Sequence, residues 1–306
     1  MCIRDSYFTT TTGGWRVELA SLREECLIDF AGAKKSSGMV GAGMGTTTLS
    51  HDDRWWAIPV RRNSISQLLV VDTHTLESKV ACENDSIGHP QFHPQDSNLI
   101  RYGGPYDRRI WVTHRDGTKN RLIYDRDVSK KEWIVHECWR PHTREILTTN
   151  WPHGVMAIHI DTGAWRWVTR FNAWHPMVDP SGKMMITDTK NPDVGLQRFD
   201  IECSETSPTL LCQSNASNIG NHWDIGHCPY DDGSVDVYAP QHTHPHPNFS
   251  PDGNLFIYTQ MLRDSHRYVN PHLKFKNIYV IISWSLVTSS WPTAVTFQRG
   301  VTAVRN

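Results

Sequence analysis

Short runs of alternating apolar and polar residues recur along the chain, and each run follows a turn rich in Asp, Pro or Gly. Alternation with a period of two buries one face of a strand, and such turn residues end the strand after a few positions. Long helical periodicity is missing almost everywhere, so the pattern predicts an all-β protein. The clearest runs are Trp55–Val60, Asn98–Tyr102, Glu145–Thr149, Lys183–Thr187 and Asn254–Thr259.

The turns before these runs recur with a period of about forty residues, and only the last interval is longer. Short strands, Asp/Gly turns and a period of this length are typical of the blades of a β-propeller. The repeats therefore predict a propeller with about six recognisable blades. The predicted blades cover residues 7–32, 45–86, 87–130, 131–172, 173–215 and 240–290.

Segments outside the repeats are predicted to be loops or irregular ends. Ser214–Ala239, rich in Asn, His, Asp and Gly, is interpreted as a long loop inserted at the mouth of the propeller. The glycine-rich stretch Gly38–Gly45 is interpreted as a flexible loop, because no Lys-Ser/Thr follows it as a phosphate loop requires. Residues 1–6 are predicted to be a non-native start. Residues 7–306 are predicted to form one propeller domain with an incomplete first blade and an irregular tail.

Four histidines stand at one fixed offset before the prolines that open these turns. Such a repeat puts the same side chain at the same place in successive blades, so we expect the four imidazoles to converge at one rim of the central channel. Imidazole is the commonest protein metal ligand and the usual general base near neutral pH. A structural histidine copied from blade to blade is the alternative. The four residues are His89, His136, His175 and His246.

The densest group of candidate metal ligands lies between Gln241 and Pro247. Positions i and i+2 of a strand face the same side, so His244 and His246 can meet one ion, with His242 in phase. Gln241 adds a neutral oxygen, and mixed imidazole and amide ligation suits a divalent ion such as Mn²⁺. Adventitious metal binding by a histidine-rich strand is the alternative.

Two further residues are candidates for chemistry. His136 lies outside the dense group, so it could stay without metal and act as a base. The forked guanidinium of Arg109, on the second strand of the preceding blade, suits a substrate carboxylate. An ion pair with a nearby acid such as Asp107 fits Arg109 equally well, and spacing alone leaves both roles open.

The composition of the chain argues against several classes of binding partner and of protein. The net charge is −1 and the pI is near 7.0, which argues against nucleic acid or an anionic membrane as a partner. The seven cysteines include no Cys-x-x-Cys pair, which argues against a disulfide framework and a zinc ribbon. No apolar run approaches the length of a membrane helix, and no secretory leader pattern opens the sequence. A cytoplasmic location is therefore the expectation.

Four motifs resemble the oligogalacturonate lyases, the propeller-fold pectate lyase family. The resemblance covers about residues 7–285. It implies a seven-bladed propeller that cleaves short oligogalacturonides in the bacterial cytoplasm with bound Mn²⁺, and it suggests a truncated member of the family. The motifs are Gly88–Ile100, Asp107–Trp111, Val135–Trp139 and Gln241–Gly253, the last being the most specific.

The resemblance also implies roles for single residues. It makes His136 the base and Arg109 its assistant, and it leaves His89 without a role, so that substrate contact and a structural function stay open for it. It places Mn²⁺ or another divalent cation on His175, Gln241, His244 and His246.

The activity expected from these residues is β-elimination of digalacturonate and similar substrates to 4,5-unsaturated uronates. The rival hypothesis is a non-catalytic propeller, a binding module similar to the TolB-like repeats, because the turns alone fit both. A hydrolase with paired carboxylates is weaker, since no Asp/Glu pair shares the register of the histidines.

Overall fold

The computed structural model describes residues 5–10, 12–30, 47–62, 64–130, 132–190, 192–203, 207–213, 245–261 and 277–283 of the 306-residue chain. Regular structure in these ranges consists of strands and one 3-10 turn, η1 (Val128–Lys130). The described helical residues include no segment long and apolar enough to cross a membrane. Four predictions fall outside the described residues: the loops at Gly38–Gly45 and Ser214–Ala239, and the ligands Gln241 and His244.

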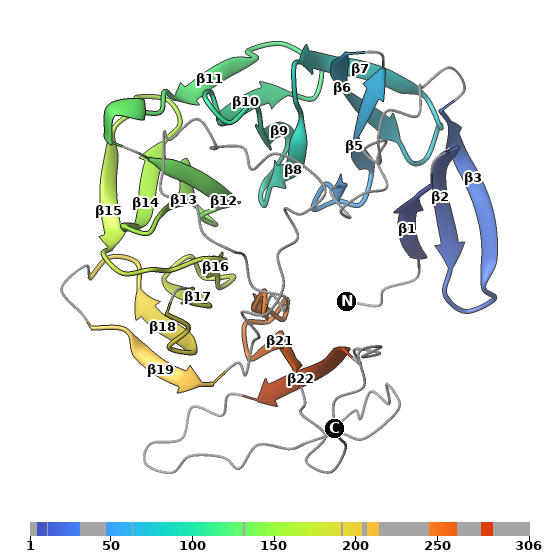
Figure 1. Ribbon diagram of the computed structural model, residues 1–306. Coiled ribbons are helices and arrows are strands. Elements are labelled where there is room, and N and C mark those ends of the chain that lie inside the picture. The colour runs from blue at the N-terminus through green and yellow to red at the C-terminus, as the bar shows by residue number, and fades with distance from the viewer. Residues whose placement is uncertain are drawn as a thin grey trace, which may run out of the picture. The chain divides into compact units, whose positions relative to one another are not determined.

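The described strands form six sheets in which neighbours along the chain pair with each other (Figure 1). The first sheet has three strands, β1 (Asp5–Thr9), β2 (Gly13–Glu18) and β3 (Arg23–Asp29). The second comprises β4 (Thr48–Leu49), β5 (Trp55–Arg62), β6 (Ile65–Asp72) and β7 (Ser78–Asn84). The third comprises β8 (Gly88–His93), β9 (Asp96–Gly103), β10 (Ile110–His114) and β11 (Arg121–Tyr124).

The remaining sheets continue the same meander. The fourth comprises β12 (Trp133–Trp139), β13 (Glu145–Trp151), β14 (Gly154–His159) and β15 (Trp165–Thr169). The fifth comprises β16 (Met177–Val178), β17 (Met184–Thr187), β18 (Leu196–Asp200) and β19 (Thr209–Cys212). The sixth has β20 (Asn248–Phe249), β21 (Leu255–Met261) and β22 (Asn277–Ser283). Each sheet corresponds to one predicted blade, although the first begins at Asp5, two residues before the start of its predicted blade. The predicted organisation into about six blades is confirmed.

The chain divides into two compact units that alternate along the sequence. The first unit contains Met1–Lys130, Trp139–Ile146 and Ile158–Trp165, and the second contains Lys131–Cys138, Leu147–Ala157 and Arg166–Asn306. Each unit is described below by itself, and the single domain expected for residues 7–306 stays a prediction.

The first unit buries both faces of its second sheet. Trp56 and Ile58 of β5 pack with Leu27 and Phe30, whereas Ala57 faces the opposite side of the sheet and packs with Ile100. Because successive side chains of a strand point to opposite faces, burial of both faces requires apolar residues at consecutive positions. Each fully buried large apolar side chain contributes roughly 1.5–3 kcal/mol.

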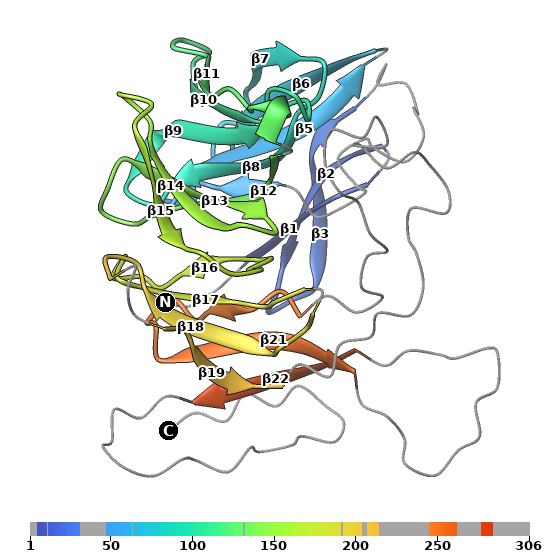
Figure 2. The ribbon, with the colours of Figure 1, turned by 60° about the vertical axis from the view of Figure 1, so that its left-hand side comes forward.

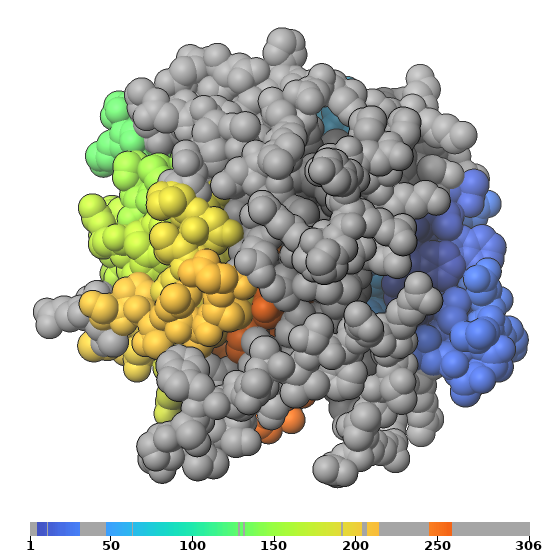
Figure 3. Space-filling view, turned by 60° about the horizontal axis from the view of Figure 1, so that its bottom comes forward, coloured from blue at the N-terminus to red at the C-terminus, as the bar shows by residue number. Residues whose placement is uncertain are grey.

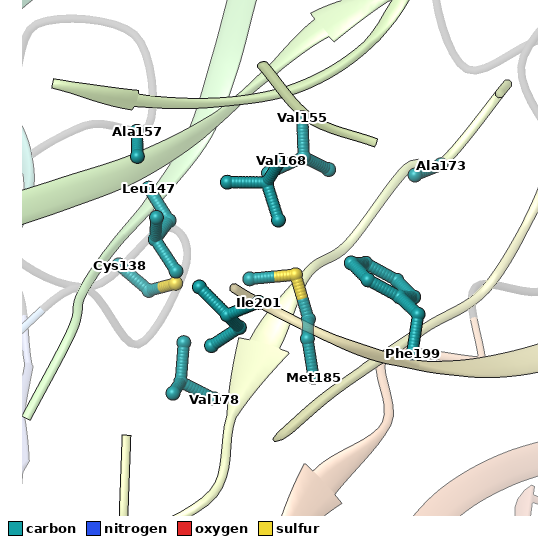
Figure 4. Packing of buried hydrophobic residues seen from close by; sticks show 10 residues of the cluster. All are labelled: Cys138, Leu147, Val155, Ala157, Val168, Ala173, Val178, Met185, Phe199 and Ile201. Atoms are coloured by element: carbon teal, nitrogen blue, oxygen red, sulfur yellow. The ribbon is translucent and has the colours of Figure 1, made fainter. Parts of the chain in front are cut away.

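The second unit has its main core between the fourth and fifth sheets. In Figure 4 the side chains of Met185 and Val168 point toward each other, with Phe199 beside them. A second cluster joins β17 and β18 to the sixth sheet through Phe256 and Tyr258, and Figures 1 and 2 both show these strands side by side. The outer strand β19 lies at the surface in Figure 3, in keeping with its two exposed and two half-buried residues.

Candidate active site

The repeat histidines occupy equivalent places at the start of four sheets. His89 lies in β8 and His136 in β12, while His175 and His246 lie shortly before β16 and β20. Each of these strands is the first of its sheet in chain order and stands at one edge of it. The fixed offset seen in the sequence therefore corresponds to one structural position that recurs in four blades.

Three of the four histidines share an unusual backbone conformation. The φ angles of His89, His136 and His246 are +48°, +55° and +43°, in the left-handed region. This conformation costs a residue with a Cβ roughly 1–2 kcal/mol. At His89 it coincides with a bulge, because the register of β8 against β9 shifts between Gly88 and Gln91. Bulges turn a side chain out of the regular alternation of a strand and are frequent beside active sites.

Three of the repeat histidines meet in the second unit, and we call them the histidine trio: His136, His175 and His246. The ring of His136 lies 4.2 Å from that of His175 and 6.3 Å from that of His246, centroid to centroid. The rings of His175 and His246 stack at 3.5 Å with an interplanar angle of 27°. Side chains from three sheets therefore form one imidazole cluster. His89 belongs to the first unit, so its convergence with the trio stays a prediction.

Three buried indole rings, which we call the tryptophan cluster, pack beside the histidine trio. Trp133, Trp151 and Trp174 contact one another edge to face, with centroids 5.4–6.0 Å apart, and all three are buried. The ring of Trp174 lies 4.6 Å from that of His136. The packing of the tryptophan cluster gives the half-buried His136 a rigid apolar side.

His175 is clamped by a buried carboxylate that the sequence did not point to. Asp188 Oδ2 lies 2.7 Å from His175 Nδ1, and Asp188 Oδ1 accepts a hydrogen bond from the backbone N–H of His175 at 2.7 Å. His175 is 5% exposed and Asp188 is not exposed at all. The signal available in the sequence was an acidic residue directly after the apolar strand β17, which is a place where burial of charge demands a partner.

A buried lysine follows two positions later and was also missed. Lys190 is 1% exposed, and its ammonium lies 4.6 Å from the centroid of the Trp174 ring. Burial lowers the pKa of Lys190 to about 8, against the opposing attraction of Asp188. A lysine is usually exposed at the surface, but Lys190 is buried because the chain after β17 remains inside the second unit.

The environment also favours the neutral form of His246. Its residue surface is more than a third exposed, yet the rings packed against its imidazole desolvate it, which lowers its pKa, while Asp188 opposes that shift. A neutral imidazole is the form that can bind a metal ion or accept a proton.

The predicted metal ligands are only partly described. Gln241 and His244 lie outside the described residues, whereas His175 and His246 are in contact. Within the described part of the chain no three His, Cys, Asp or Glu side chains are arranged to hold a metal ion. The donor set nevertheless fits one, because a carboxylate on the far nitrogen of a histidine is the usual support of a metal ligand. Asp188 gives His175 that support.

Arg109 lies in the first unit, directly before β10 rather than within it. It is half-buried, and its guanidinium occupies the space beside Gly103, where a Cβ atom would approach within 2.8 Å. The guanidinium also lies 5.8 Å from the Tyr106 ring centroid, and its Nη1 lies 3.5 Å from the carbonyl oxygen of Gly104. Asp107, its alternative partner, lies 3.3 Å from Nε of Arg108.

Comparison with known proteins identifies relatives for this fold. A family model described as oligogalacturonate lyase matches residues 55–270. The oligogalacturonate lyase of Dickeya dadantii (strain 3937) is 26% identical over 211 residues, which are 64% of this chain and 53% of that protein. The chain thus spans about half the length of this curated relative.

Two solved structures confirm the fold. An oligogalacturonate lyase in complex with manganese aligns with a TM-score of 0.65 and 20% identity, over 92% of this chain and 74% of that one. The β-propeller domain of the Trilobed protease from Pyrococcus furiosus aligns with a TM-score of 0.53 and 12% identity, over 91% and 77% of the two chains. The six described meanders are therefore blades of a β-propeller, as predicted.

Proposed function

Because the chain belongs to the oligogalacturonate lyase family, we propose that it is a lyase that cleaves short oligogalacturonides, digalacturonate among them, by β-elimination. The observation that carries the proposal is the histidine trio, in which a half-buried imidazole lies beside two others from neighbouring blades. A structural repeat needs no such contact, whereas metal-assisted proton abstraction needs a base next to a ligand set. The cytoplasmic location stays a prediction.

The base in this mechanism is His136. The C5 proton of a galacturonate lies α to a carboxylate, so a neutral imidazole can remove it. The electron pair of the C5–H bond then forms the C4=C5 double bond as the C4–O bond breaks, and the departing oxygen takes up a proton. The product is a 4,5-unsaturated uronate at the new non-reducing end. General-base assistance of this kind is typically worth about 10²–10⁴-fold in rate.

Removal of the C5 proton increases the negative charge on the substrate carboxylate, and a positive charge beside it stabilises that state. A divalent cation such as Mn²⁺ supplies this charge when bound, as a Lewis acid. His175 and His246, with Gln241 and His244, would hold it. Arg109 would assist through the forked pair of N–H groups that suits a carboxylate. Asp188 holds the ring of His175 in place, and desolvation of His246 favours its neutral imidazole, the form that can ligate.

The test is the metal-dependent absorbance of the conjugated product, measured with digalacturonate and Mn²⁺. We expect the wild type to produce it and His136→Gly to lose at least 10²-fold in kcat, the lower bound for a general base. Glycine is the sharper replacement for this histidine, since it adopts the φ of +55° without strain and keeps the fold. His153→Ala, in the exposed turn between β13 and β14, is the matched control and should keep full activity.

Two results would contradict the proposal. One is a folded wild type that forms no unsaturated product with any divalent cation, which would favour the rival hypothesis of a binding module. The other is full activity in folded His136→Gly, which would remove this residue from the role of base.

A further inference from the structure

Both carboxylate oxygens of Asp188 contact the same residue, His175. Oδ1 accepts the backbone N–H of His175 and Oδ2 faces Nδ1 of its ring, each at 2.7 Å. Two contacts to the same residue fix both the position of its backbone and the rotation of its imidazole. Asp188 has no exposed surface, so water does not compete for these oxygens.

The backbone around this pair is held as firmly as the ring. The N–H of Trp174 donates to the carbonyl oxygen of Asp188 at 2.9 Å, and the N–H of Lys190 donates to the carbonyl oxygen of Asn172 at 3.3 Å. On the other side, the hydroxyl of Thr149 donates to the carbonyl oxygen of Trp174 at 2.9 Å. The segment that carries His175 is thus tied to both the fourth and the fifth sheets.

The chemistry of this contact selects one tautomer of His175. An ionised carboxylate can only accept hydrogen bonds, so Nδ1 carries the proton, and in the neutral ring Nε2 then keeps its lone pair. A hydroxyl or carbonyl oxygen could also satisfy the backbone N–H, but the carboxylate oxygen on Nδ1 in addition makes the imidazole a stronger electron donor.

We propose that Asp188 is a positioning residue that fixes His175 in the tautomer whose Nε2 is the acceptor, ready for a divalent cation. This inference rests on the proposed function and adds a residue to it. His175 stacks on His246 and contacts His136, so a change in its rotation or tautomer would disturb the whole histidine trio. Asp188 therefore acts on the candidate site chiefly by holding His175.

The decisive variant is Asp188→Asn, which preserves shape and removes only the charge. Its amide oxygen can still accept the backbone N–H, which turns the NH₂ group toward Nδ1. The amide then donates to Nδ1, and the ring proton moves to Nε2, the wrong tautomer for a ligand. We expect the ¹⁵N NMR shifts of His175 in the metal-free protein to show this exchange. Mn²⁺ affinity, followed by EPR titration, should fall about 10–100-fold.

Asp179→Asn is the matched control. Asp179 lies in the turn between β16 and β17 of the same sheet, where its Oδ1 accepts the backbone N–H groups of Lys183 and Met184 at 2.9 Å. The same chemical change there should leave the tautomer of His175 and the affinity for Mn²⁺ within twofold of the wild type.

The possible outcomes separate this inference from the proposed function. An unchanged tautomer in folded Asp188→Asn, or an unchanged Mn²⁺ affinity, overturns the positioning role. A wild type that binds Mn²⁺ in the expected tautomer but forms no unsaturated product contradicts the proposed lyase activity and leaves the positioning role supported. A wild type whose metal-free His175 carries its proton on Nε2 overturns the inference directly, whatever the activity.

Discussion

At the scale of single residues, the repeat encodes a backbone conformation as well as a side chain. His89, His136 and His246 are all left-handed, a conformation that a residue with a Cβ adopts at a cost. Strain of this kind persists where the surrounding structure enforces it, and it is frequent at functional sites. The strained backbone at these positions therefore makes their imidazoles the first ones to test for a functional role.

The strain at His136 gives the first prediction. We expect His136→Gly to be more stable than His136→Ala by about 1 kcal/mol, because glycine avoids a left-handed penalty that alanine keeps. Urea denaturation of the two variants measures the difference directly. An alanine variant as stable as the glycine variant would show that the backbone relaxes out of the left-handed region.

Lys190 provides a prediction on pH. Its native pKa of about 8 lies below the ordinary value of 10.5, so the unfolded chain binds this proton more tightly. The free energy of unfolding should therefore gain about 3 kcal/mol from this group as the pH rises from 8 to 10.5. At lower pH this contribution is lost, since the buried amine is then charged.

The measurement is the difference in unfolding free energy between Lys190→Met and the wild type at pH 7 and at pH 10. The difference cancels the titration of thiols and phenols, whose burial acts in the opposite direction, as at Cys82 with its raised pKa of about 11. We expect the advantage of Lys190→Met to shrink at the higher pH. An advantage that does not depend on pH would contradict the lowered pKa.

At the scale of elements, the alternation of apolar and polar residues predicts where strands lie but not where they contain bulges or left-handed residues. The run Trp55–Val60 appears in the structure as β5, and the run Glu145–Thr149 as β13, each slightly longer than predicted. The bulge at His89 and the left-handed residue inside β12 were not predicted. These irregularities depend on how neighbouring strands pair, which a single strand does not record.

Close approach of two strands gives a prediction at Gly154, the first residue of β14. Its φ is +147°, and a Cβ atom there would lie 2.0 Å from the carbonyl oxygen of Thr169 in β15. We expect Gly154→Ala to lower the free energy of unfolding by about 2 kcal/mol or more, since the backbone must move. Gly88→Ala is the control, because nothing lies within 4 Å of the added Cβ atom, and its effect should stay within about 0.5 kcal/mol. Equal losses in the two variants would contradict this explanation.

At the scale of the whole molecule, the proposed cation couples folding to metal binding. A ligand that binds only the native state stabilises it by about 2.7 kcal/mol at a concentration of 100 Kd. We therefore expect Mn²⁺ to raise the Tm and EDTA to reverse the effect. His246→Ala should abolish the response, while His153→Ala, in an exposed turn, should keep it. A rise in Tm that survives His246→Ala would place the ion elsewhere.

The sequence by itself determined the architecture and most of the candidate residues. Period-two alternation and turn chemistry are local, so they predict the all-β class, the repetition of about six blades and the common register of four histidines. The candidate roles of His136, His175 and His246 followed from that register and from the family motifs. None of these inferences needed a contact between residues far apart in the chain.

Only the tertiary structure decided which side chains surround those histidines. In the sequence, Asp188 and Lys190 resemble other charged residues. The structure shows that the chain after β17 is buried, with Asp188 beside His175 and Lys190 beside Trp174. Burial, tautomer and pKa depend on neighbours brought together within the fifth blade and from the blades beside it, and those neighbours have no fixed spacing in the sequence. The fold therefore follows from local pattern, whereas the chemical state of the histidine trio depends on three-dimensional packing.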